Sequence, residues 1–80
     1  MTLHVKVISP EASLYEGDAS SVVAPAFDGK VGILTNHAPM MTLLGKGELR
    51  IDNTKFTIDG GFLQVVNNQV RVVTEKGTPA

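Results

Sequence analysis

Short runs in which apolar and polar residues alternate are the feature that most constrains the fold of this chain. The clearest runs are residues 3–8, 48–52, 55–59 and 69–72. Successive side chains of a strand point to opposite faces, so each run presents one apolar and one polar face. No window shows convincing helical periodicity. The alternation therefore predicts an all-β fold.

Turn-forming residues separate these runs at short, fairly even spacing. Gly and Asn tolerate the positive φ of tight hairpins, and Asp-Gly and Asn-rich pairs favour type I′ turns. The predicted turns lie at residues 9–10, 16–18, 28–29, 36–39, 45–47, 52–53, 60–61 and 67–68. This spacing predicts about ten short antiparallel strands, packed as a β-sandwich or a flattened barrel.

Two segments need separate treatment. Residues 38–44 are interpreted as a strand that is buried on both faces, and a single helical turn after Pro39 is the alternative. Residues 76–80 are predicted to be a flexible C-terminal tail. The predicted domain spans residues 1–75.

Composition excludes several classes of function. The chain has 80 residues, which corresponds to one small domain, and a net charge of −1 with its Lys and Arg dispersed. Nucleic-acid binding favours a clustered basic face, so nucleic acid is not expected as a partner. The absence of Cys excludes disulfides and thiolate catalysis. No apolar run approaches the ~20 residues that cross a bilayer, so we expect no direct membrane insertion.

The residues that carry chemistry do not form a recognisable catalytic pattern. His4 and His37 lie far apart, without carboxylates at a metal-ligand spacing, and no Ser lies in a Gly-flanked nucleophile elbow. Residues 45–47 lack the spacing of a phosphate-binding loop. We expect no catalytic residue, no metal and no cofactor. An enzyme with a polar site on the sandwich surface or between copies is the alternative.

One stretch carries a family resemblance. Residues 28–42 read DGKVGILTNHAPMMT, and the segments 7–11, 14–17, 47–51 and 60–65 follow a matching order. This pattern resembles the signature of the ATP synthase epsilon subunit: an acidic turn with Gly, then Gly-Ile-Leu, a short turn, His-Ala-Pro and two large apolar residues. The resemblance covers nearly the whole chain.

The resemblance implies a ten-stranded β-sandwich, which a two-helix hairpin follows in many members. In the family that hairpin carries inhibition of ATP hydrolysis and, in some members, ATP binding. Because the chain stops just after the last predicted strand at residues 70–74, we expect a short form without the hairpin and without either property. A naturally short member and a domain cut from a longer protein both fit.

The resemblance also implies a function. The chain is expected to be a non-catalytic rotor subunit of the central stalk, which couples c-ring rotation to the gamma subunit for proton-driven ATP synthesis. It would lie at the periphery of an energy-coupling membrane, on the cytoplasmic (or thylakoid stromal-type) side. The alternative is a free-standing β-sandwich that binds another protein through a sheet edge.

Matching positions suggest two groups of contact residues. Those expected at the gamma subunit are Ser9, His37 and Thr42, with Pro39 and Met41 adding apolar contact. Those expected at the polar loops of the c-ring are Asp28, Gly29 and Lys30. Because the position of Lys30 is commonly acidic in the family, we expect a compensating change in the partner or a greater share for Asp28.

Overall fold

The computed structural model describes residues 2–80, and all regular elements in this range are strands. The strands are β1 (Leu3–Ile8), β2 (Ser13–Ala19), β3 (Ser21–Ala26), β4 (Gly29–Leu34), β5 (Met40–Ile51), β6 (Thr54–Val66), β7 (Gln69–Val73) and β8 (Gly77–Pro79). They form one sheet in the order β2-β1-β7-β6-β5-β3-β4, and β8 pairs with β6. The all-β prediction is confirmed.

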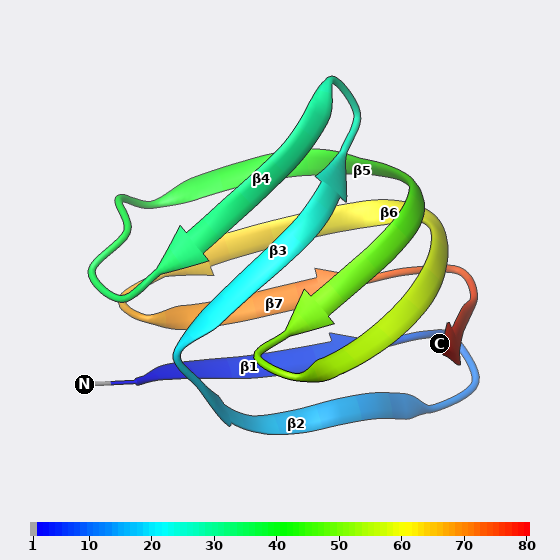
Figure 1. The fold of residues 1–80 in the computed structure, drawn as a ribbon, viewed down its shortest axis with the longest axis horizontal. Coiled ribbons are helices and arrows are strands. Elements are labelled where there is room, and N and C mark those ends of the chain that lie inside the picture. The colour runs from blue at the N-terminus through cyan, green and yellow to red at the C-terminus, as the bar shows by residue number, and fades with distance from the viewer. Residues whose placement is uncertain (1) are drawn as a thin grey trace.

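The long strands β5 and β6 bend, and this folds the sheet into two layers (Figure 1). We define the first layer as β2, β1, β7, residues 62–66 of β6 and residues 40–44 of β5. The second layer contains β4, β3, the remainder of β5 and β6, and β8. Gly60 and Gly61 have φ values of 87° and 124° at the bend of β6, and a Cβ on Gly61 would overlap the backbone of Val73.

The predicted strand count of about ten is wrong, because the structure has eight strands. Residues 45–47 lie inside β5 and residues 60–61 lie inside β6, so these glycines bend long strands and do not end them. Residues 16–18 lie within β2, so the turn predicted there is also wrong. The remaining predicted turns lie between strands, except that Gly29 of the turn at residues 28–29 is already the first residue of β4.

The sheet is not purely antiparallel and does not close into a barrel. β1 pairs with β2 antiparallel but with β7 in parallel, from His4↔Gln69 to Ile8↔Val73. β2 and β4 are the two ends of the strand order. The prediction that all strands pair antiparallel is therefore wrong at β1. Its parallel neighbour β7 follows more than sixty residues later in the chain.

The hydrophobic core fills the space between the two layers. Its members come from every strand except β8, and most are aliphatic. They are Leu3, Val5, Val7, Ala19, Val22, Ala24, Ile33, Leu44, Leu49, Ile51, Phe56, Ile58, Leu63, Val65, Val70 and Val72. They follow the period of two, as the alternation predicts.

Two segments differ from expectation or extend it. Residues 38–44 contain the start of β5, but Met41 and Leu43 are exposed, so the strand is not buried on both faces and the alternative helical turn does not form. Within the predicted tail, Gly77–Pro79 forms β8, and Ala80 N donates to Lys55 O at 3.0 Å. Flexibility of this segment stays a prediction. Residues 2–80 contain no helix with the length and apolar character that crossing a membrane requires.

Candidate protein-docking surface

A row of apolar side chains crosses the outer face of the first layer. Leu43 pairs with Phe62, Phe62 with Val73, and Val73 with Ile8. Directly opposed residues on neighbouring strands share a face, so these four side chains lie next to one another. We call this set the apolar row. Leu43 is 66% exposed, and the other three are only partly buried.

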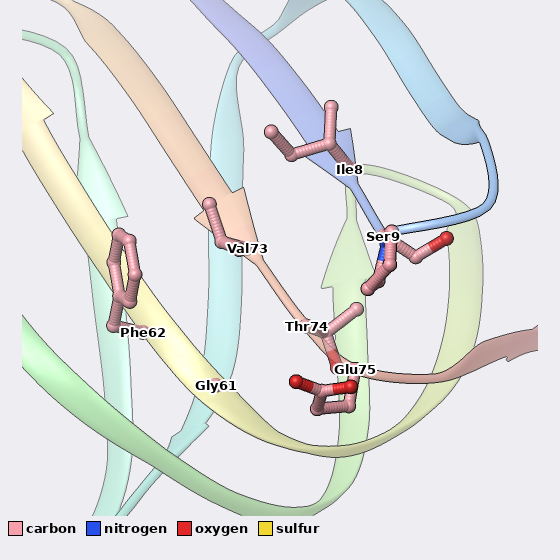
Figure 2. Close-up of a pocket in the computed structure, with 8 residues that line it drawn as sticks. Ile8, Ser9, Gly61, Phe62, Val73, Thr74 and Glu75 are labelled. Atoms are coloured by element: carbon pink, nitrogen blue, oxygen red, sulfur yellow. The ribbon is translucent and has the colours of Figure 1, made fainter.

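One end of the apolar row borders an open hollow of about 320 Å³. Figure 2 shows Phe62, Val73 and Ile8 on the neighbouring strands β6, β7 and β1 beside it. Ser9 and Pro10 of the β1–β2 turn complete this side. Because the hollow is lined mainly by carbon, it suits an apolar side chain of another protein and not a charged ligand.

The rest of the outer face is mainly polar, with Met41 and Val66 as its exposed apolar residues. The next row toward the opposite end of the strands contains Met41, Gln64, Arg71 and Lys6, by the same pairing. Beyond it His4 contacts two carboxylates of β2: its Nδ1 lies 3.3 Å from Asp18 Oδ1, and its Nε2 lies 3.7 Å from Glu16 Oε2. We call the complete face the outer surface.

Two of the residues expected at the gamma subunit lie on β5, on opposite sides of it. Met41 belongs to the outer surface and is 65% exposed. Thr42 pairs with the buried Leu63 and therefore faces the inner side, where its hydroxyl donates to Leu43 O at 3.4 Å. Of these two residues, only Met41 lies beside the apolar row.

His37 and Pro39 lie in the β4–β5 loop at the end of the outer surface. His37 Nδ1 lies 2.8 Å from Ala38 O, so Nδ1 carries the proton and Nε2 stays free to accept a hydrogen bond. The β6–β7 turn holds this loop, because Asn36 N donates to Asn68 Oδ1 at 2.6 Å. The loop and the turn lie together at the left of Figure 1.

Ser9 lies at the opposite end of the outer surface, in the β1–β2 turn. Its hydroxyl donates to Ala12 O at 3.2 Å and accepts from Ala12 N at 3.3 Å. Both bonds close the turn. The structure therefore brings Ser9 to the hollow at the apolar row, but it does not bring Ser9 to His37.

The residues expected at the c-ring lie at the β3–β4 hairpin, which stands beside β5 at the top of Figure 1. Asp28, Gly29 and Lys30 are all exposed, and Gly29 has a φ of 134°. Phe27 precedes them and is 81% exposed, and its amide donates to Leu43 O at 2.9 Å. The hairpin thus presents an acidic, a basic and an aromatic side chain together.

Within residues 2–80 the titratable side chains are dispersed over the surface. The described residues contain no group of three or more His, Cys, Asp or Glu that could hold a metal ion. His4 and His37 lie on different elements, and every titratable side chain in this range lies at or near solvent.

Sequence reasoning missed the apolar row. Each of its members stands next to a buried apolar residue, in the doublets Val7-Ile8, Leu43-Leu44, Phe62-Leu63 and Val72-Val73. In a strand, such a doublet places one apolar side chain on each face. These doublets could have indicated the apolar row from the sequence, but only the pairing register shows that their outward-facing members lie side by side.

Comparison with known families and relatives gives a consistent result. The family described as "ATP synthase, Delta/Epsilon chain, beta-sandwich domain" matches residues 2–80. The ATP synthase epsilon chain of Leptospira borgpetersenii serovar Hardjo-bovis (strain JB197) is 43% identical over 79 residues, which cover 94% of this chain and 62% of the relative. That of Synechococcus sp. (strain JA-2-3B'a(2-13)) is 38% identical over 80 residues, which cover 95% of this chain and 58% of the relative. The chain thus spans less than two thirds of the length of these relatives.

Solved structures share the fold at low identity. A chain of the Euglena gracilis mitochondrial ATP synthase (OSCP/F1/c-ring, rotational state 1) superposes with a TM-score of 0.87 at 18% identity, over 98% of this chain and 53% of that one. A chain of the central stalk/c-ring of the Tetrahymena thermophila mitochondrial ATP synthase gives 0.82 at 17%, over 98% and 66%. The family match over residues 2–80 and the epsilon-chain relatives show that this chain belongs to the ATP synthase delta/epsilon family and contains its β-sandwich domain.

Proposed function

We propose that this chain is a non-catalytic subunit of the ATP synthase central stalk that couples rotation of the c-ring to the gamma subunit. The observation that carries the proposal is the apolar row, which the described chain leaves uncovered on a face of a domain of this family. Contiguous exposed apolar side chains with a polar rim are typical of a protein-protein interface. The family supplies the class of partner.

Each part of the molecule has a place in this proposal. The outer surface binds the gamma subunit, with direct contacts from Met41, His37 and Pro39. Ser9 contributes at the hollow at the other end of the outer surface, and Thr42, which faces inward, acts only by stabilising the strand that carries Met41. The β3–β4 hairpin binds the polar loops of the c-ring, with Asp28 as the acidic contact. The chain would then act at the membrane periphery, held there by its protein partners.

A titration against the gamma subunit of the same organism tests the proposal. We expect wild-type chain to bind at one-to-one stoichiometry. Met41→Asp should weaken the affinity about 30-fold, because a charge in the desolvated centre of an interface costs about 2 kcal/mol. Leu34→Asp is the matched control, since Leu34 is 64% exposed on β4 of the second layer and Met41 is 65% exposed.

His37→Ala tests the loop separately. Its loss removes the free Nε2 acceptor at the end of the outer surface but no core contact, so we expect an affinity loss of about fivefold without a change in melting temperature. If the well-folded wild-type chain does not bind the gamma subunit, the coupling function is wrong. If Met41→Asp and Leu34→Asp weaken binding equally, the interface is not on the outer surface.

A further inference from the structure

Two cations lie side by side on the outer surface. Lys6 of β1 and Arg71 of β7 are directly opposed in the parallel pair and are both exposed. Like charges in directly opposed positions destabilise a sheet. A carboxylate close to Lys6 and Arg71 would offset the repulsion between the two cations, and the nearest candidates are on β2.

Those carboxylates are directed elsewhere. Glu16 is the strand partner of Lys6 on β2, but its carboxylate lies 3.7 Å from His4 Nε2. Asp18 also contacts His4, at 3.3 Å. Within residues 2–80, the contacts found between a basic side chain and a carboxylate all involve His4, and neither involves Lys6 or Arg71. Lys6 and Arg71 therefore keep their hydrogen-bond donors for another molecule.

The surface is hollowed on both sides of Arg71. One hollow of about 300 Å³ is lined by His4, Lys6, Gln69, Val70 and Arg71. A second, of about 180 Å³, is lined by Gln64, Val66, Gln69 and Arg71. The guanidinium is planar and offers paired N–H donors, which match the two oxygens of a carboxylate.

We propose that Lys6 and Arg71 form a carboxylate-binding site, which accepts an Asp or Glu side chain of the gamma subunit. This inference rests on the proposed function and deepens it. The site lies two residues along the strands from the apolar row, on the same face, so one partner segment carrying apolar side chains and an acidic residue covers both. Arg71 and Val73 alternate on β7, as Lys6 and Ile8 do on β1.

The surroundings favour a protein carboxylate over a polyanion. Glu16 and Asp18 lie on the adjacent strand and repel a chain of phosphates. The adjoining apolar row offers nothing to a free anion but is complementary to the apolar part of a protein segment. Desolvation by that segment strengthens the charge pair beyond what an exposed pair contributes.

The test compares the affinity of the gamma subunit for four chains at several salt concentrations. They are the wild type, Arg71→Gln, Arg71→Lys and the double variant Lys6→Gln/Arg71→Gln. Arg50→Gln is the control, because Arg50 also opposes a cation, Lys55, on exposed strand positions away from the outer surface. We expect the double variant to bind about tenfold more weakly, with a flatter salt dependence.

Arg71→Lys should retain the salt dependence and lose only part of the affinity, because it keeps the charge and loses the planar fork. Arg50→Gln should bind like the wild type. The melting temperature of each variant shows that it is folded. Wild-type affinity and salt dependence in the double variant would overturn the carboxylate site alone. If the wild-type chain itself does not bind, the coupling function falls as well.

Discussion

The inner and outer faces of the first layer come from alternate residues of the same strands, and they differ in what covers them. On β1, Leu3, Val5 and Val7 are fully buried against the second layer. On the other face of β1, the side chains run from His4 through Lys6 to Ile8, from polar to apolar. Alternation explains both faces, but the chain itself covers only the inner face. The apolar end of the outer face is the part that the proposed partner would cover.

Val5→Asp gives the largest expected effect, because it places a charge in the closed inner face. Val5 is 0% exposed, and a carboxylate there has no partner. We expect a loss of more than about 4 kcal/mol from the free energy of unfolding, which leaves a small domain largely unfolded at 25 °C. Circular dichroism in increasing denaturant measures it.

Lys6→Gln is the control for Val5→Asp, since it changes the neighbouring residue on the outer face and should melt at or slightly above the wild-type temperature, because it removes the repulsion with Arg71. A normal unfolding curve for Val5→Asp would contradict the assignment of inner and outer faces on β1.

Asn68→Ala gives an intermediate effect, at the edge where the two faces meet. Asn68 has a φ of 61°, its Oδ1 accepts from Asn36 N at 2.6 Å, and its carbonyl accepts from His4 N at 2.8 Å. Ala loses the side-chain bonds and tolerates positive φ poorly, so we expect a destabilisation of about 2 kcal/mol. Denaturant titration measures the change.

Asn68→Gly separates the two causes, because Gly removes the side-chain bonds and accepts the positive φ. It should therefore lose about half as much stability as Ala. Equal losses would assign the whole effect to the bonds that hold the His37 loop, and no loss in either variant would show that the loop does not depend on Asn68.

The sequence was sufficient to predict the class of fold but not its topology. Alternation over residues 3–7 and 69–72 identifies strands and their inner faces. It cannot show that β1 and β7 are neighbours in parallel, because that pairing joins the two ends of the chain. Gly60 and Gly61 were read as a turn because a positive φ suits a hairpin equally well. When the neighbouring strands continue past the bend, a glycine with positive φ changes the direction of the strand but does not end it.

The candidate site was less predictable than the fold. Met41 was singled out beside Pro39, and it does lie on the outer surface. Phe62 and Val73 were not, because nothing local distinguishes an exposed apolar residue from a buried one in an apolar doublet. Their significance comes from the register across β5, β6, β7 and β1, which depends on contacts distant in sequence.

Leu43→Ser has the smallest expected effect on stability and tests the comparison most directly. Leu43 is 66% exposed and the next residue, Leu44, is 6% exposed on the opposite face of β5. We expect Leu43→Ser to change the free energy of unfolding by about 0.5 kcal/mol or less, whereas Leu44→Ser should cost about 3 kcal/mol. Binding to the gamma subunit should show the opposite order when only folded protein is compared. Leu43→Ser should weaken the affinity about tenfold, because it removes one end of the apolar row.

Paired denaturation and binding titrations measure both quantities. Equal destabilisation by the two variants would mean that Leu43 already packs within the domain, and the apolar row would then be part of the core and not a docking surface.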